Sequence, residues 1–537
     1  MIDPSVFSHP AVGSFSMYLD RWNSLYLLGV GVVTPMISLY SYPYLDHHLD
    51  SMKEEGRDVS SLYKYYFLYT IFAASMMGFL LTTNLLMQFI YIILTGFSSF
   101  LIIWHFGYGS RRATATTYLV WSVIGTALFL MGIIAFGYHV GTFDIINPIT
   151  TDWNEGLGSD LTVIIPLLLF FAIWVKQSLF GFHVWLPHSD DCAPTPLSAV
   201  ISPNFVGISS YVLVRVLGQI FPIHFSMFFP LFLVLGFITM VYGGLTALAQ
   251  DDLQRLLAYS TISQMGWIVF GIGTMTSAGM KGGVLLFVTQ SLSSSVLFMV
   301  SGLLIIRYDG LQDISEMGEL LTIDPILSSF VIMGFLTLVG APLTVGFWAK
   351  TFIFSEAIKN QLITGPVTFI IIIVFVVFAG GITASYSFLT IKRMLFGWFK
   401  GDSEPKPLKW NRTTYSIAFI GLVSIILFFF PTPLLGPAKP PRLSVLTIEG
   451  LIFLTSYLGA YTIFSGKARY YVVLLSYKIE NGILDYFLYE KMFSWIENSK
   501  KKIRLVDEDS FSSSVYWLTL SITIFILCFH IFFLVLR

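Results

Sequence analysis

Residues 166–187, PLLLFFAIWVKQSLFGFHVWLP, form an apolar stretch with one charged side chain, Lys176, near its middle. A second stretch of this kind, GFLTLVGAPLTVGFWAKTFIF at residues 334–354, carries Lys350. A charge at the centre of a bilayer costs about 2.5 to 3.5 kcal/mol on insertion scales, so such residues usually have a function. Each lysine lies beside a helix-weakening run, QSLFG after Lys176 and GAP, residues 340–342, before Lys350. Interrupted membrane helices form ion sites, so the pattern predicts an ion or proton path.

The composition predicts an all-α polytopic membrane protein. Of the 537 residues, 55% are hydrophobic, 17% aromatic and only 11% charged, which is far less charge than a soluble domain carries. Cys192 and Cys528 are the only cysteines, so the chain has no disulfide framework and no zinc or iron–sulfur spacing. We therefore expect no cofactor or metal in this chain and expect electron transfer to lie on other chains. Apolar runs of spanning length predict about fourteen transmembrane helices, starting near residues 22, 65, 85, 115, 162, 197, 226, 257, 284, 325, 366, 413, 448 and 514.

Basic residues gather in alternate loops, although the formal net charge is only -1. One set of loops holds Arg111-Arg112, Arg307 and the basic stretch 467–504, whereas the opposite set holds few basic residues. The positive-inside rule makes the first side cytoplasmic and places both termini outside. Residues 467–508 interleave large apolar residues with charges at helical spacing, which predicts an amphipathic lateral helix on the cytoplasmic surface. This helix either anchors the chain in lipid or straps neighbouring subunits together.

The order of the predicted segments indicates an internal duplication. Residues 65–217 hold five segments, the fourth of which contains Lys176, and residues 226–391 hold five more, the fourth of which contains Lys350. An odd number of crossings makes two copies face opposite ways, as in transporters built from inverted repeats. Coincidence is the alternative explanation, because this pattern is one of position and not of matching sequence. The remaining predicted parts are an N-terminal helix and loop (1–64), two further transmembrane helices (413–466), the lateral helix (467–508) and a final transmembrane helix (514–537).

Several motifs carry a resemblance to one family. VKQSLFGFHVWLPHSDDCAPTPLSAVIS, residues 175–202, resembles the signature of the antiporter-like subunits of respiratory complex I, of Mrp antiporters and of membrane-bound hydrogenases. TALAQDDLQRLLAYSTISQMGWIVFGIG at 246–273 is similar to a loop and helix of that family, and GAPLTVGFWAKTFIF at 340–354 resembles its broken twelfth helix. The lateral helix followed by a final transmembrane helix resembles the L-type member. The resemblance extends from about Asp20 to the C-terminus.

The resemblance implies proton translocation by a subunit with two inverted five-helix repeats, driven by redox chemistry in other subunits. It matches Lys176 and Lys350 to the residues that carry protons in the broken seventh and twelfth helices. The fifth helix departs from the family pattern, because Ile93 stands where relatives place a glutamate beside the seventh-helix lysine. Neutral residues also replace the charged or histidine positions of the eighth and eleventh helices. These residues are Ser202 or Gly207 in the eighth helix, and Leu286, Gln290 and Ser294 in the eleventh.

We predict a proton pathway through Lys176, Lys350 and His183. Lys176 lies about fourteen residues, or about 21 Å, into its segment, too deep for its stem to snorkel to an interface. His183 either relays protons as a neutral imidazole or satisfies a backbone carbonyl freed by the broken helix. Asp190 and Asp191 are interpreted as solvated loop charges, with proton collection at a channel mouth as the alternative. The polar residues of the eleventh helix either hold a water wire or are small residues that allow close helix packing; they are Thr289, Gln290, Ser291, Ser293, Ser294 and Ser295.

Three functions compete. The favoured one is a proton-translocating antiporter-like subunit in the membrane arm of a complex-I-like oxidoreductase, of the NADH:quinone dehydrogenase or hydrogenase type, with no redox centre in this chain. The alternatives are Mrp-type sodium/proton exchange and a structural subunit with a degenerate proton pathway, which the missing acid at Ile93 favours. The expected partners are other antiporter-like and small membrane subunits and the lipid bilayer, without nucleic acid. The expected location is an energy-transducing membrane, namely the prokaryotic cell membrane.

Overall fold

The computed structural model describes most of the predicted helical region. The described residues are 8–9, 13–14, 16–54, 61–145, 161–221, 228–308, 310–359, 366–399 and 410–430, together with Leu454 and Leu458. The predicted helix near residue 448, the lateral helix at 467–508 and the final helix at 514–537 lie outside these residues and stay predictions.

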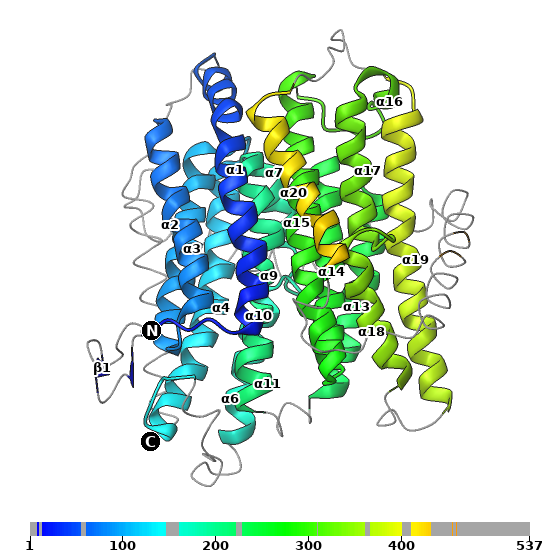
Figure 1. Cartoon of the computed structure of the whole chain (residues 1–537). Helices are drawn as coiled ribbons and strands as arrows, with labels where there is room; N and C mark the ends of the chain where they lie inside the picture. Colours follow the sequence, from blue (N-terminus) through cyan, green and yellow to red (C-terminus); the bar gives the residue numbers. More distant parts are fainter. Residues whose placement is uncertain are drawn as a thin grey trace, which may run out of the picture.

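The described chain is almost entirely helical, as the composition predicts, and Figure 1 shows its helices side by side. Two short strands, β1 (Ser8–His9) and β2 (Gly13–Ser14), form an antiparallel pair near the N-terminus. The first group of helices comprises α1 (Arg21–Glu54), α2 (Leu62–Leu81), α3 (Leu85–Phe106), α4 (Arg111–Val140), α6 (Leu161–Lys176) and α7 (Trp185–Cys192). One further span follows as α8 (Thr195–Val200), the π-helix η3 (Ile201–Phe205), α9 (Val206–Ile208), α10 (Ser210–Val212), the π-helix η4 (Leu213–Leu217) and α11 (Gly218–Ile220). The second group comprises α13 (Phe229–Ala249), α14 (Leu253–Gly273), α15 (Ser277–Arg307), α16 (Leu320–Ile323), α17 (Pro325–Val339), α18 (Val345–Lys359), α19 (Pro366–Phe396) and α20 (Arg412–Phe429).

The helices identify an integral membrane protein. Within the described residues, nine helical spans are long and apolar enough to cross a bilayer, and two shorter apolar helices, Val163–Lys176 and Pro325–Val339, are the first halves of the interrupted segments. Each of the first twelve predicted segments contains a helix that begins within seven residues of its expected start. The full number of fourteen is not established by the described residues.

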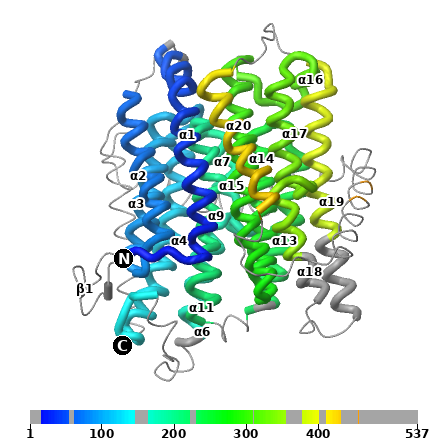
Figure 2. Tube along the Cα trace, in the orientation of Figure 1, coloured from blue at the N-terminus to red at the C-terminus, as the bar shows by residue number. Residues whose placement is uncertain are grey.

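Two helices cross between the two groups and join them. Figures 1 and 2 show α1 and α20 lying across the bundle, and α1 packs on α2, α8, α15 and α20. Tyr40 of α1 donates a hydrogen bond to the carbonyl of Met299 in α15 (2.8 Å). The inverted-repeat relation between the two groups stays a prediction.

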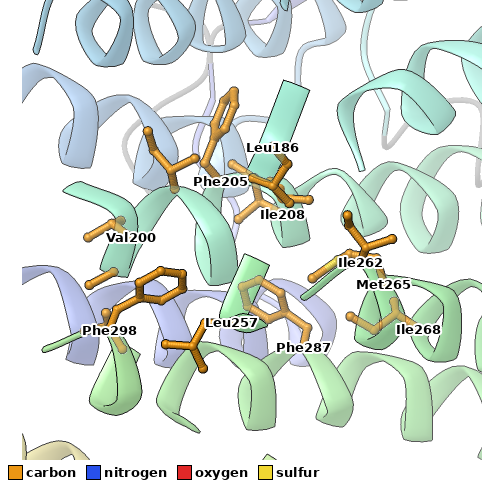
Figure 3. Close-up of a cluster of buried hydrophobic side chains, with 14 of the residues drawn as sticks. Leu186, Val200, Phe205, Ile208, Leu257, Ile262, Met265, Ile268, Phe287 and Phe298 are labelled. Atoms are coloured by element: carbon orange, nitrogen blue, oxygen red, sulfur yellow. The ribbon is translucent and has the colours of Figure 1, made fainter. Parts of the chain in front are cut away.

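The centre of the molecule is an apolar seam between the two groups. In both α14 and α15 the most apolar stretch of 18 residues is wholly buried, and these helices pack against α7, α8 and η3. In Figure 3, Leu186 of α7 and Phe205 and Ile208 of the span that follows it gather opposite Met265 and Phe287 of the second group. The described structure therefore brings the two lysine-bearing groups together across a largely hydrophobic interface.

Both predicted helix interruptions are present. Between α6 and α7 the chain leaves helical geometry over residues 177–184, with positive φ at Ser178 (52°) and Gly181 (95°). Between α17 and α18, Gly340 adopts the left-handed conformation (φ 83°) and Leu343 also has a positive φ (71°). Glycine adopts this geometry without the steric cost of a Cβ atom. Ser178 and Leu343 bear that cost, which is typical of functional sites.

The basic helix ends lie on one face, as the charge pattern predicts. Arg307 at the end of α15 forms an ion pair with Asp324 at the start of α17 (2.6 Å). Near the end of α19, Arg393 pairs with Asp251, just before α14 (2.9 Å). These pairs bring the basic ends of α15 and α19 to the same face as the starts of α14 and α17, and we call this the basic face. The assignment of this face to the cytoplasm stays a prediction.

Candidate functional site

Lys176 is the last residue of α6 and lies inside the bundle, with 7% of its surface exposed. Its amine donates a hydrogen bond to the hydroxyl of Ser122 in α4 (2.9 Å) and lies 5.5 Å from the ring centre of Phe205. A small cavity of about 20 Å³, with room for about one water molecule, adjoins the side chain. Gly125 of α4 provides part of this room, since a Cβ atom there would approach Lys176 Cγ to 3.0 Å. The lysine is therefore held in the interior by a neutral partner and an aromatic face.

The position expected to lie beside Lys176 faces the other way. Ile93 is 44% exposed, whereas Ile92 and Thr95 border the cavity at the lysine. Adjacent residues on a helix point about 100° apart. An error of one residue in aligning this helix with its relatives is therefore enough to select the exposed Ile93 in place of a residue that faces Lys176. The prediction that Ile93 adjoins the lysine is therefore wrong. Within the described chain, no ion pair to Lys176 is formed.

Lys350 closes the break between α17 and α18. Only 3% of its surface is exposed, and its amine donates to the carbonyls of Leu338 (3.2 Å) and Val339 (2.9 Å). These carbonyls belong to the last turn of α17, where the helix leaves acceptors without an intrahelical partner. The amine also lies 5.3 Å from the ring centre of Trp267 in α14. Lys350 therefore caps a half-helix inside the membrane region, where the negative end of the helix dipole favours a cation.

His183 lies in the break between α6 and α7 and is buried. Its Nε2 is 3.0 Å from the hydroxyl of Tyr242 in α13, and its Nδ1 has no hydrogen-bond partner among the described residues. In the same break, the buried amide of Gln177 and hydroxyl of Ser178 also lack partners in the described part of the chain. His183 thus bonds a phenol and not a freed backbone carbonyl. The break concentrates polar groups that are able to bind water.

The predicted polar residues of α15 divide between two arrangements. Gln290 donates to Thr261 of α14 (3.0 Å) and to Ser294 (2.7 Å), and Ser202 of η3 donates to Thr261 (2.9 Å). These four side chains form one hydrogen-bonded row across the seam. Thr289 and Ser291 lie outside the row. Thr289 bonds the carbonyl of Leu285 on its own helix, and Ser291 bonds Asn204 (2.5 Å).

The structure corrects the interpretation of Asp190. This residue of α7 was expected in a solvated loop, but its exposed fraction is 0%, whereas Asp191 beside it is partly exposed.

The sequence analysis did not identify two hydrogen-bond partners in the site, Ser122 at Lys176 and Tyr242 at His183. Both lie more than 50 residues from the side chain they bond, and no local pattern signals such pairings.

Comparison with known proteins shows the family. Residues 82–379 match the family model described as "NADH:quinone oxidoreductase/Mrp antiporter, TM". Among curated proteins, the chain is 30% identical over 442 residues to NAD(P)H-quinone oxidoreductase subunit 5, chloroplastic, of Chaetosphaeridium globosum, covering 78% of this chain and 61% of that protein. The corresponding Zea mays protein is 30% identical over 429 residues, covering 76% and 54%. The chain thus spans less than two thirds of the length of these relatives.

Solved structures show the same fold at lower identity. Respiratory complex I from Thermus thermophilus with bound NADH contains a chain that matches with a TM-score of 0.67 and 19% identity, covering 83% of this chain and 87% of that one. The Mrp complex from Dietzia sp. DQ12-45-1b gives a TM-score of 0.70 and 23% identity, covering 94% and 55%. The archaeal membrane-bound sulfane sulfur reductase gives 0.67 and 22%, covering 83% and 86%. The chain is an integral membrane protein that belongs to the NADH:quinone oxidoreductase/Mrp antiporter transmembrane family, the antiporter-like subunits.

Proposed function

We propose that this chain translocates protons as an antiporter-like subunit in the membrane arm of a complex-I-like respiratory oxidoreductase. The observation that carries the proposal is the position of Lys176. Its amine is buried at a helix break beside a small cavity and, among the described residues, is hydrogen-bonded only to the hydroxyl of Ser122. No fixed negative charge holds a proton on this amine within the described structure. Burial disfavours a charged amine, so the group is suited to take up a proton and release it again.

Lys350 is the second proton-carrying group of the proposal. Its amine faces the carbonyls of Leu338 and Val339, which stabilise the ammonium form, and the ring of Trp267 acts in the same direction. The row Ser202–Thr261–Gln290–Ser294 crosses the seam between the two groups. The hydroxyls of this row both donate and accept, whereas the amide nitrogen of Gln290 only donates. The row therefore supplies polar groups that orient water and hydroxyls across the seam and is not by itself a continuous relay. His183 is placed to extend the path through Tyr242.

The proposed setting is a multisubunit complex in an energy-transducing membrane. The matching chains of complex I, of the Mrp complex and of the sulfane sulfur reductase all belong to such complexes. The partners would be further membrane-arm subunits, and redox chemistry on other chains would drive translocation.

A second candidate function is sodium/proton exchange. It is supported by the family description and by the Mrp complex, whose matching chain aligns with 94% of this chain. A third reading, a structural subunit without a working path, is favoured by the apolar seam and by the absence of a carboxylate paired with Lys176 among the described residues.

One experiment separates these functions. The complex is purified through a tag on this chain, reconstituted in vesicles, and driven by whichever of NADH, reduced ferredoxin or hydrogen it oxidises, while internal pH is recorded. We expect Lys176→Ala to lower the number of protons moved per electron, and Lys281→Ala, at a half-buried lysine near the start of α15, to leave it unchanged. Unchanged pumping by an assembled Lys176→Ala complex would establish the structural reading. Labelled-sodium uptake under an imposed pH gradient would establish exchange.

A further inference from the structure

Asp190 is a buried acid that the proposed pathway has not yet used. Its exposed fraction is 0%, and neither carboxyl oxygen has a hydrogen-bond partner among the described residues. A buried carboxylate without donors or a counterion would be strongly destabilising. The surroundings therefore suit the neutral carboxyl, which retains its proton in the resting protein.

The hydroxyls closest to this carboxyl point elsewhere. Ser198 and Ser202 both lie within reach of it, but Ser198 donates to the backbone carbonyl of Asp190 (3.2 Å) and Ser202 donates to Thr261. Asp191, the next residue along the chain, repels a negative charge on Asp190. The described surroundings therefore do not stabilise a fixed carboxylate at this position.

Asp190 lies between the basic face and Lys176. It is two residues from the end of α7, where the carbonyl of Cys192 accepts a hydrogen bond from the amide of Tyr108 (2.7 Å) in the connection between α3 and α4. That connection leads directly into Arg111 and Arg112 at the start of α4. Gln254, near the start of α14 on the basic face, donates a hydrogen bond to Thr195 just after α7 (3.0 Å). The end of α7 that carries the acid therefore lies on the side of the basic face.

A row of polar groups leads from Asp190 towards Lys176. The ring of Tyr118 in α4 packs against Trp185 of α7, the helix that carries Asp190 (ring centroids 5.4 Å apart). The Tyr118 hydroxyl is hydrogen-bonded to Ser99 (2.6 Å). One turn further along α4, Ser122 accepts the hydrogen bond from Lys176 (2.9 Å). Tyr118, Ser122 and Lys176 border one narrow packing gap. On its other side, Asp190 meets the cross-seam row through Ser202.

We propose that Asp190 is the internal acid that delivers protons from the basic face to Lys176. This inference rests on the proposed function. In the step, the carboxyl O–H bond breaks, the hydroxyls of Tyr118 and Ser122 each accept one proton and release another, and an N–H bond forms on Lys176. The products are a carboxylate at Asp190 and an ammonium at Lys176. Water at the basic face then returns a proton to the carboxylate, which restores the resting state.

The test uses the reconstituted complex with three single variants. Asp190→Asn keeps the size of the side chain and removes its exchangeable acid, and Asp191→Asn makes the same change at the partly exposed neighbour. Lys176→Ala measures the proposed function itself. We expect Asp190→Asn to lower the protons moved per electron by the same factor as Lys176→Ala, and Asp191→Asn to leave this ratio at the wild-type value.

The outcomes separate the two proposals. If Lys176→Ala lowers pumping and Asp190→Asn does not, the role of Asp190 is overturned while the proposed function stands. If Lys176→Ala has no effect, the proposed function fails first. If the Asp190→Asn complex fails to assemble, carbodiimide treatment of the wild-type complex tests the role of Asp190 instead, because this reagent adds to protonated carboxyls in apolar surroundings. An adduct on Asp190 together with loss of pumping supports the proposal, and either full pumping by the modified complex or no adduct at Asp190 overturns it.

Discussion

Replacing Lys350 by methionine tests how firmly its amine holds the interrupted helix together. The wild-type amine donates to the carbonyls of Leu338 and Val339 at 3.2 and 2.9 Å. Carbonyls of the preceding turn accept backbone N–H groups from the break itself, so they do not depend on the lysine. Methionine keeps a long unbranched side chain and leaves two buried acceptors without their donor.

The magnitude follows from those contacts. A buried hydrogen-bonding group left without a partner costs about 1–3 kcal/mol, so losing the donor to two carbonyls costs about 2–6 kcal/mol. The lost contact with the ring of Trp267, 5.3 Å from the amine, adds about 0.5–2 kcal/mol. Lys176→Met removes one hydrogen bond, to a Ser122 hydroxyl that can rotate towards another acceptor, and the contact with the ring of Phe205, 5.5 Å from the amine. These losses together are expected to cost about 1–3.5 kcal/mol, less than those at Lys350.

The assay is the apparent melting temperature of the detergent-solubilised complex, followed by fluorescence-detected size exclusion at one fixed heating schedule. Lys350→Met should melt clearly below Lys176→Met, with Lys281→Met as the surface control. Equal melting temperatures for the Lys350 and Lys281 variants would refute the argument that the amine caps α17. That result would leave proton carriage as the only remaining role for Lys350.

Three further predictions test neighbouring features. Gly125→Ala places a Cβ atom 3.0 Å from Lys176 Cγ and should displace the amine. We expect slower proton flux, measured as internal pH in vesicles, and a loss of about 1–3 kcal/mol of stability, measured by melting. Gln290→Met removes the donor to Thr261 (3.0 Å) and should lower proton flux with a stability change of only about 0.5–1.5 kcal/mol per lost bond; unchanged flux would exclude the cross-seam row. Burial raises the pKa of Asp252, the N-cap of α14, so the folded protein binds this proton more tightly than the unfolded chain does. The folded protein therefore loses stability as the pH rises above the ordinary pKa of an aspartate. Asp252→Asn keeps a good cap, and its complex should therefore melt above wild type at neutral pH, with the advantage vanishing in acid; an advantage independent of pH would contradict this.

The sequence predicts the framework of the site well, for local reasons. Both breaks are signalled by residues that weaken helices, and Gly340 does adopt the left-handed conformation. The burial of Lys176 and Lys350 follows from their depth in long apolar runs. Such features depend on the chain within one or two helical turns, so they are readable before the fold is known.

The side chains that surround the lysines are set by tertiary packing, so they cannot be predicted from the local sequence. Ser122 meets Lys176 across a separation of 54 residues. Asp190 stands in a polar run, HSDD, that is typical of a solvated loop, yet packing of α7 against α4 and α14 buries it. For Ile93, an error of one residue in an ungapped match was enough to select an exposed residue instead of one that borders the cavity at Lys176.

The distribution of ionisable groups explains how so apolar a centre could still move charge. Lys176 ends α6, where the helix dipole favours a cation, whereas its burial disfavours one. The site thus combines one effect that favours the ammonium with another that favours the free amine. Transfer from Asp190 would create a carboxylate and an ammonium in surroundings of low dielectric, where separated charges are costly. Prompt return of a proton from the basic face removes the negative charge and leaves the positive charge on the lysine. The absence of fixed counterions around the described lysine is therefore compatible with conduction, because the neutral hydroxyl of Ser122 can accept from an ammonium or donate to a free amine.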